Sequence, residues 1–296
     1  MNLFSISQLQ QYSGIKAHTI RIWEQRYNAL TPGRSEGNTR YYDDSQLRRL
    51  LNIVSLMDQD YKVSELCTMS DEAMFKLLEK QLETISAVGD PLEYYISQLI
   101  ASSVTYDEVL FEKIFSNCLL RLGMKDAFVK VMYPMLVRVG LMWSSDSLPT
   151  AQEHFISNLL RQKLFAAMDA LPLPQKDSGT WVLFLPENEF HEIGLLLSAY
   201  LIRLAGRKVI YLGSNVPADS LTNTVAQVDP SDVFFFLVHY DVPEAVQEYV
   251  DRVAGFLKGR RLHIAGNAKL LAQLKFKKGA NWIQSVEQLD QQLSAN

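Results

Sequence analysis

The sequence predicts a multidomain protein in which a small all-α domain is followed by a helical bundle and then by an α/β domain with a parallel sheet. Short helical patterns broken by turn signals come first, then helical periodicity without strand signals, then alternating strands and helices. A stretch with two prolines and a glycine, Leu171–Thr180, separates the last two regions. The predicted domains are residues 1–75, 76–172 and 179–296.

Composition and charge are those of an ordinary globular protein of two or three domains. The chain has 296 residues, of which 48% are hydrophobic and 21% charged, and its net charge is −4. Residues 1–50 hold seven Lys and Arg and four Asp and Glu, a net of +3, which leaves −7 for the rest. The acidic total therefore conceals a basic N-terminal region, and a nucleic-acid partner is compatible with it.

Cysteine usage and the N-terminus indicate a cytoplasmic protein without membrane contact. Cys67 and Cys118 lie far apart, which excludes a disulfide framework and a zinc site built on paired cysteines, so we expect two buried thiols. The N-terminal ten residues lack a basic region followed by an apolar stretch. Apolar runs such as Val233–Val238 are too short to span a bilayer.

Two helices joined by a tight turn are predicted at the N-terminus. Ser5 or Ser7 caps the first helix, and Gly14 supplies the turn before a second helix, Ala17–Tyr27. This is the geometry of a helix-turn-helix. The second helix turns Ile20 and Trp23 inward and leaves these polar side chains mostly outward: His18, Thr19, Arg21, Gln25 and Arg26.

The segment from Leu30 to Tyr42 is predicted to form a small hairpin, or wing, because it contains two glycines and an asparagine. Arg34 and Arg40 lie at its two ends, within reach of phosphates on a bound nucleic acid. Asp43 and Asp44 are placed to cap the helix that follows.

Together these residues resemble the winged helix-turn-helix of the MerR family. The motifs are Thr-Ile-Arg-x-Trp-Glu-x-Arg-Tyr at 19–27, Leu-x-Pro-x-Arg at 30–34 and Gly-x-x-Arg-Tyr-Tyr at 37–42. In that family the second helix enters the major groove and the wing contacts the DNA backbone, which implies a double-stranded DNA operator as partner. Thr19 and Arg21 are then candidate base or phosphate contacts. The full set of candidate DNA-binding residues is His18, Thr19, Arg21, Arg26, Tyr27, Arg34, Arg40 and Tyr41.

In the helical region, one predicted helix face comprises Val109, Phe111, Ile114, Phe115, Cys118 and Leu119. After residue 180, alternating elements predict βαβ units with right-handed crossovers. The predicted strands are Trp181–Leu185, Lys208–Leu212, Val233–Val238, Arg261–Ala265 and a fifth at Trp282–Ile283. The predicted helices are Gly194–Ala205, Ala218–Val228, Pro243–Leu257 and Lys269–Leu274.

Two clusters that contain a histidine are the next candidate functional motifs. Glu153-His154 follows Trp143 after nine residues, at the start of an apolar helix. Glu189-x-His191 lies between the first strand and first helix of the α/β domain, at the sheet edge where such domains hold cofactors. A lone histidine in either place is often only a structural hydrogen-bond partner. At this edge, however, an imidazole is a good transition-metal ligand, and a carboxylate such as Glu189 can orient it.

The loop Glu-x-His-x-x-Gly followed by Tyr211-Leu212-Gly213 resembles the cobalamin-binding domain of methionine synthases and mutases. There the histidine replaces dimethylbenzimidazole as the lower axial cobalt ligand. The Trp-x9-Glu-His segment resembles the bundle that covers the upper cobalamin face in the CarA/CarH group of photoreceptor regulators. With the MerR-like N-terminus, the resemblance covers nearly the whole chain in the same domain order, including the Rossmann-like sheet.

This resemblance implies a DNA-binding transcriptional regulator, a repressor, that senses adenosylcobalamin and light. His191 would coordinate cobalt, Trp143 would pack over the upper face, and Glu153 and His154 would cap the upper ligand. The implied cofactor-binding residues are Trp143, Glu153, His154, Glu189, His191, Gly194, Gly213 and Gly266. A homo-oligomer, dimer or tetramer, is also implied. Because no sustained heptads follow the winged helix, it would use the sensor domains.

Three positions depart from the family pattern. Ser144 follows Trp143, where members that form a bis-histidine photoproduct have a second histidine. The third strand ends in Leu237-Val238-His239-Tyr240, where cobalamin domains usually carry a small Ser/Thr motif near the buried nucleotide tail. Ala265-Gly266 replaces the common Gly-Gly after the fourth strand. Bulkier side chains beside that tail are expected to weaken cobalamin binding.

Two other hypotheses stay open: a cofactor-free regulator that keeps the fold, and a corrinoid methyl-carrier subunit. The winged helix favours a regulator over an enzyme, as does the lack of a further domain to bind a substrate beside cobalt. A bulky Trp143 over the upper face would also obstruct group transfer.

Overall fold

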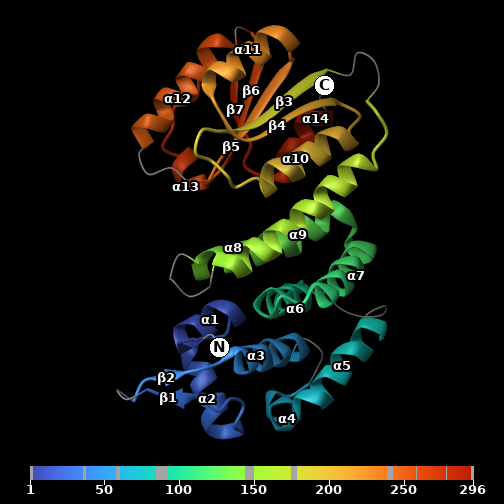
Figure 1. Cartoon of the computed structure of the whole chain (residues 1–296), viewed down its shortest axis with the longest axis vertical. Helices are drawn as coiled ribbons and strands as arrows, with labels where there is room; N and C mark the ends of the chain where they lie inside the picture. Colours follow the sequence, from blue (N-terminus) through green and yellow to red (C-terminus); the bar gives the residue numbers. More distant parts are fainter. Residues whose placement is uncertain are drawn as a thin grey trace. The chain divides into compact units, whose positions relative to one another are not determined.

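The computed structural model describes residues 3–35, 38–57, 61–84, 92–143, 150–174, 179–238, 243–257, 259–277 and 279–294. The chain divides into two compact units, residues 1–158 and 159–296. The division falls inside one helix, α9 (Thr150–Asp169), which begins in the first unit and ends in the second (Figure 1). The three domain boundaries drawn from the sequence stay a prediction.

The first unit opens with the predicted helix-turn-helix. Helix α1 (Ile6–Ser13) begins at Ser5, whose side chain forms a capping box with Gln8, and it ends at Gly14. Gly14 has a φ of 72°, the left-handed conformation that glycine adopts without strain. Helix α2 (Ala17–Tyr27) buries the two side chains predicted to face inward, Ile20 and Trp23. The predicted cap, turn and second helix are therefore confirmed, with Ser5 as the cap.

The predicted wing is a two-stranded antiparallel hairpin, β1 (Gly33–Arg34) and β2 (Arg40–Tyr41). Helix α3 (Asp44–Met57) follows, and the Asp43 carboxylate accepts a hydrogen bond from the Gln46 N–H at 3.0 Å. Hydrogen bonds from the Ser45 hydroxyl and from the Gln46 N–H lower the pKa of Asp43. The carboxylate is therefore ionised at neutral pH and caps α3, as predicted.

The remaining elements of the first unit are helical. They are α4 (Val63–Thr68), α5 (Asp71–Thr84), α6 (Leu92–Thr105), α7 (Glu108–Ala127), the π-helical turn η1 (Phe128–Met132), α8 (Tyr133–Trp143) and the start of α9. The helical character predicted for this region is confirmed for the described residues. Cys67 and Cys118 are free and buried, also as predicted.

One residue of the predicted buried face of α7 was assigned wrongly. Phe111, Ile114 and Cys118 are fully buried, but Val109 is 80% exposed. Val109 is the second residue of α7, two positions after the Asp107 cap, and at this end of the helix it remains exposed. Leu119, at the edge of the same face, is half-buried.

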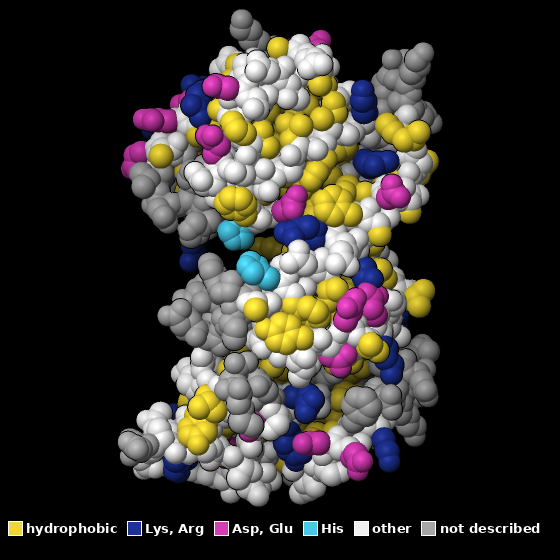
Figure 2. All heavy atoms as spheres, in the orientation of Figure 1, with side chains coloured by type: hydrophobic (Ala, Val, Ile, Leu, Met, Phe, Trp, Pro, Cys, Tyr) yellow, Lys and Arg dark blue, Asp and Glu magenta, His cyan; other side chains and the backbone are white. Residues whose placement is uncertain are grey.

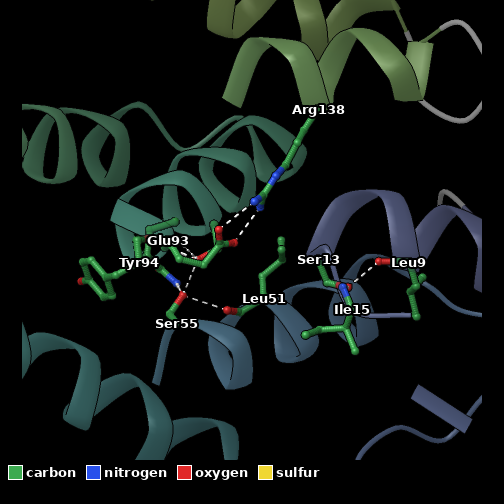
Figure 3. Close-up of polar contacts among 10 residues, drawn as sticks. Leu9, Ser13, Ile15, Leu51, Ser55, Glu93, Tyr94 and Arg138 are labelled. Atoms are coloured by element: carbon green, nitrogen blue, oxygen red, sulfur yellow. Dashed lines mark hydrogen bonds and ion pairs between the residues drawn. The ribbon is translucent and has the colours of Figure 1, made fainter. Parts of the chain in front are cut away.

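Helix α3 packs against α6 through buried polar contacts. The hydroxyls of Ser55 and Ser97 lie 2.7 Å apart, and the Gln98 amide donates to Ser55 at 2.9 Å. Arg138 of α8 donates from both terminal nitrogens to the two carboxylate oxygens of Glu93 on α6, at 2.6 and 2.7 Å (Figure 3). Because satisfied buried polar groups favour one packing arrangement, the contacts of Ser55 fix the packing of α3 against α6, and the partly exposed Arg138–Glu93 pair links α8 to α6.

The second unit is a five-stranded parallel sheet in the order β4-β3-β5-β6-β7 (Figure 1). The strands are β3 (Thr180–Pro186), β4 (Lys208–Val216), β5 (Asp232–Leu237), β6 (Arg261–Gly266) and β7 (Ala280–Trp282). The helices are α10 (Ile193–Leu204), α11 (Ala218–Val228), α12 (Pro243–Phe256), α13 (Ala268–Leu271) and α14 (Val286–Ser294). The predicted α/β fold and fifth strand are confirmed, whereas α14 was not predicted.

The strand order creates a switch point between β3 and β5. The chain goes from β3 outward to β4 on one side and then returns to β5 on the other. Buried side chains of α11 and α12 pack on one sheet face, together with Val233, Phe235 and Leu237 of β5. In an open parallel sheet, ligands bind outside the carboxyl ends of the strands at such a point. Among the described residues, no helix is both long and apolar enough to cross a membrane.

Candidate functional site

The loop between β3 and α10 lies at the switch point and carries the predicted metal ligand. It is tied to the end of β4, because the Asn188 N–H donates to the Asn215 side chain at 3.0 Å and the Asn215 N–H donates to the Glu189 carbonyl at 3.3 Å. Asn188 and Asn215 both have positive φ, near 60°, which asparagine tolerates better than most residues. The loop is thus fixed by residues that sequence reasoning did not single out.

Glu189 is the centre of this loop. Its side chain is fully buried, but both carboxylate oxygens accept hydrogen bonds. One oxygen accepts from the N–H groups of Phe190 at 2.9 Å and His191 at 3.0 Å. The other oxygen accepts from the N–H of Val238, just beyond β5, at 2.8 Å. Hydrogen bonds to a carboxylate are among the stronger ones in proteins. A single buried carboxyl group therefore holds the β3–α10 loop against the end of β5.

His191 contacts the same carboxylate with its side chain. Its Nδ1 lies 2.6 Å from Glu189 Oε1, which is the pairing predicted from the sequence. An ionised carboxylate only accepts, so in the neutral histidine tautomer that donates from Nδ1 the ring lone pair lies on Nε2. The side chain is 52% exposed. An oriented, accessible imidazole of this kind is suited to bind a transition metal through Nε2.

No group of three or more His, Cys, Asp and Glu side chains gathers in a metal-binding arrangement within the described part of the chain.

The next carboxylate, Glu192, links the loop to two other elements. It accepts from the Tyr211 hydroxyl of β4 at 2.8 Å and pairs with Arg161 of the last turns of α9 at 2.9 Å. Phe165, one turn further along α9, meets the Tyr211 ring edge-on at 6.2 Å. Burial, together with the hydrogen bond to Glu192 and the negative charge of that carboxylate, raises the pKa of Tyr211 far above its ordinary value. The loop that carries His191 is thereby anchored to α9 and β4.

The three predicted glycines each have a role in the fold. A Cβ added at Gly194 would lie 2.6 Å from the ring of Phe236, so α10 and β5 approach too closely for a side chain. Gly266 has a φ of 133°, and a Cβ there would overlap the carbonyl oxygen of Leu237. Gly213 has a φ of 79°, which disfavours a side chain although space is available. Their contact with a cofactor stays a prediction.

The predicted upper-face residues lie in the first unit. Glu153 and His154 occupy the first turn of α9, with His154 Nδ1 3.1 Å from a Glu153 oxygen and its side chain 66% exposed. Histidine side chains are visible at the surface of the molecule (Figure 2). Trp143 ends α8, but its side chain, like all of Ser144, lies outside the described residues, as do His239 and Tyr240.

The predicted DNA-binding side chains of α2 divide by exposure. His18, Arg21 and Arg26 are exposed, whereas Thr19 and Tyr27 are half-buried. A row of exposed cationic and polar side chains on one helix is the arrangement by which a recognition helix contacts DNA.

The predicted contacts of the wing already have partners inside the protein. Arg34 is exposed and donates across the hairpin to the Asn38 side chain at 2.6 Å. Arg40 pairs with Glu24 of α2 at 3.3 Å, and this carboxylate also accepts from the Tyr42 hydroxyl. The Tyr41 ring covers Gly33, where a side chain would overlap it. Arg40 thus fastens the wing to α2, and its role toward phosphates stays a prediction.

Known proteins match the chain in the predicted order. Residues 4–72 match the family model described as MerR HTH family regulatory protein, and residues 95–167 match the B12 binding domain. The chain is 32% identical over 233 residues to the HTH-type transcriptional repressor CarH of Myxococcus xanthus, covering 78% of this chain and 77% of that protein. It is 26% identical over 290 residues to the repressor CarA of the same organism, covering 96% and 94%.

A solved structure supports the fold of about two thirds of the chain. The monomethylamine corrinoid protein of Methanosarcina barkeri matches with a TM-score of 0.54 and 15% identity, covering 67% of this chain and 96% of that one. The sequence matches, the winged helix-turn-helix and the parallel sheet lead to one conclusion. The chain belongs to the family of HTH-type transcriptional repressors that includes CarH and CarA, in which a MerR-type DNA-binding domain precedes a B12-binding region.

Proposed function

We propose that this regulator senses adenosylcobalamin through His191 and couples the state of that cofactor to operator binding. The observation that carries the proposal is the accessible His191 imidazole, whose Nδ1 is held by the buried Glu189 carboxylate so that Nε2 is the ligand nitrogen. His191 would hold the cobalt ion through Nε2, and the corrin ring would supply the other ligands that the protein does not. The match of residues 95–167 to a B12 binding domain supports the same cofactor.

Bound adenosylcobalamin would supply a cobalt–carbon bond that light cleaves. Trp143, Glu153 and His154 are proposed to cover and hold the upper ligand, as the family resemblance implies. Glu189 orients His191, and the contacts of Glu192 with Tyr211 and Arg161 connect the loop to α9, the helix on which Glu153 and His154 also lie. Loss of the upper ligand would shift a two-state equilibrium of the bundle.

On the DNA side, we propose a repressor that binds a double-stranded operator as a homo-oligomer, dimer or tetramer. The exposed Arg21 and Arg26 of α2 and Arg34 of the wing are its candidate phosphate or base contacts. Such contacts release counterions from DNA, so binding weakens steeply as salt rises.

The cofactor part is tested by titrating the full chain with adenosylcobalamin in the dark and recording absorption spectra before and after green light. We expect saturable binding, an axial-ligand shift in the spectrum, and a further change on illumination. His191→Ala should lose the axial shift, and free imidazole should restore it, which separates lost coordination from misfolding. Saturable binding with no effect of His191→Ala would reject this ligand, and no binding at all would favour the cofactor-free regulator. Methyl transfer in a turnover assay would favour the carrier subunit.

The DNA part is tested with a mixed-sequence 30-base-pair duplex over a range of salt concentrations. Arg21→Ala should lower the slope of log affinity against log salt by about one contact. Lys269→Ala is the matched control, because this exposed cation lies on α13 of the second unit. Equal slopes for both variants would remove Arg21 from the DNA interface.

A further inference from the structure

We propose that Phe236 makes this chain discriminate between corrinoids by the nucleotide loop below the corrin ring. Cobinamide, which lacks this loop, then binds more tightly than cobalamin. The inference rests on the proposed corrinoid binding at His191 and narrows its ligand class. At the switch point, the protein's own side chains fill the space at the edge of the sheet.

Phe236 lies at the carboxyl end of β5, beside the loop that carries His191. Side chains along a strand alternate between faces, and Val233, Phe235 and Leu237 pack into the cluster under α11 and α12. Phe234 and Phe236 therefore point to the opposite face. Here Phe236 meets the start of α10. It lies two residues before Val238, just beyond β5, whose N–H donates to the Glu189 carboxylate.

The ring of Phe236 occupies the space that Gly194 leaves. A Cβ built on Gly194 would lie 2.6 Å from Cε1, 3.1 Å from Cδ1 and 3.2 Å from Cζ of this ring. An entire ring edge therefore lies against the backbone three residues after His191. The absence of a side chain at Gly194 makes room for the Phe236 ring. This ring leaves no space for a ligand group at that point.

The ring is also held from below, so it cannot sink further into the sheet. The centroids of Phe234 and Phe236 are 5.4 Å apart, and Phe234 is fully buried. Phe234 in turn packs edge-on against Trp181 of β3 at 6.5 Å. Since protein interiors are close-packed, moving Phe236 inward would displace this aromatic row.

The space beside Gly266, at the same edge of the sheet, is also filled by atoms of the protein. At Gly266 a Cβ would overlap the carbonyl oxygen of Leu237, because the ends of β5 and β6 are in backbone contact. The N–H of Asn267 donates to that carbonyl at 2.8 Å. Two small residues beside the His191 loop thus accommodate the chain's own atoms.

This packing has a consequence for a corrinoid held by His191. When a protein histidine takes the lower axial position, the base of cobalamin's nucleotide loop is displaced from cobalt. The loop stays tethered to the corrin ring and must find space close to the histidine. Cobinamide carries the same cobalt and ring without base, ribose or phosphate. It can therefore use His191 while Phe236 stays in place, whereas cobalamin must force Phe236 aside.

The test is a pair of absorption titrations of the full chain, with diaquacobinamide and with aquacobalamin, which compares their dissociation constants. We expect wild type to bind cobinamide at least about tenfold more tightly, equivalent to about 1.4 kcal/mol. Phe236→Ser should remove most of this ratio by strengthening cobalamin binding, since a small side chain vacates the space beside Gly194. Phe276→Ser is the matched control, because Phe276 is another half-buried ring of the second unit, stacked on Trp282 at 6.4 Å.

Circular dichroism melts of both variants show whether they fold, and the wild-type ratio tests the proposal without any variant. Equal wild-type affinities for the two corrinoids, or an unchanged ratio in a folded Phe236→Ser, would overturn the selectivity and leave corrinoid sensing in place. Failure of wild type and Phe236→Ser to bind either corrinoid would overturn both proposals. Binding of cobalamin by Phe236→Ser alone would support the role of Phe236 and reject cobalamin sensing by the natural chain.

Discussion

Replacing Glu189 with glutamine should destabilise the second unit although the two side chains are nearly equal in size. The carboxylate is fully buried and, among the described residues, accepts hydrogen bonds from the N–H groups of Phe190, His191 and Val238 and from the His191 ring. An amide keeps one accepting oxygen and turns the other into a donor. If the oxygen faces the Phe190 and His191 side, the new NH₂ group meets the Val238 N–H, and two donors then face each other.

The size of the effect follows from these contacts. A buried donor left without an acceptor costs about 1–3 kcal/mol, and the bonds that survive lose the part of their strength that comes from the charge. We therefore expect Glu189→Gln to lower the free energy of unfolding by about 3–4 kcal/mol, a large part of the roughly 5–15 kcal/mol that stabilises a typical domain. The Val238 amide should also lose its protection from hydrogen exchange.

The assay is urea unfolding followed by tryptophan fluorescence, combined with amide hydrogen exchange at Val238. Glu248→Gln, an exposed carboxylate on α12 of the same unit, is the control and should change stability by less than about 0.5 kcal/mol. If Glu189→Gln unfolds within about 1 kcal/mol of wild type and protects Val238 normally, then the carboxylate does not organise this loop.

Three further predictions concern packing and protonation. Gly266→Ala should destabilise the second unit by more than about 3 kcal/mol in a thermal melt, because its Cβ overlaps a neighbouring carbonyl, while Gly255→Ala, with open space around it, should be neutral or stabilising. A double-mutant cycle on Arg138 and Glu93 should give a coupling of about 1 kcal/mol, because both side chains are partly exposed, and a value near zero would remove the pair from the α6–α8 contact. Burial raises the pKa of the Cys118 thiol to about 12, so it should stay protonated at pH 8 and react with a thiol reagent only as fast as the protein unfolds; rapid reaction in the native state would contradict this.

Patterns of a few residues were enough to predict the elements of this fold. The Ser5 cap, the Gly14 turn and the inward Ile20 and Trp23 are short-range features, and the backbone follows them whatever the rest of the chain does. The alternation of strands and helices after residue 180 predicted the parallel sheet for the same reason. Helix α14 was not predicted, although its buried Leu289 and Leu293 have a spacing of four that indicates a helix.

The candidate site was predicted only in part, because its partners depend on strand order. The pairing of His191 with Glu189 joins residues two apart, so spacing alone indicated it. The bond from Val238 to Glu189 spans 49 residues and exists because β5 lies beside β3. The position of Phe236 against Gly194 has the same origin, and no local pattern contains it.

What the sequence alone determined is therefore the order of the domains, the helices and strands within them, and the family to which they belong, since caps, turns and periodicity act over a few residues. Only the tertiary structure decided which side chains share the sheet edge beside His191, because that depends on which strands become neighbours. There the Glu189 carboxylate fixes the loop that carries His191 to the end of β5, and the Phe236 ring fills the space next to that loop.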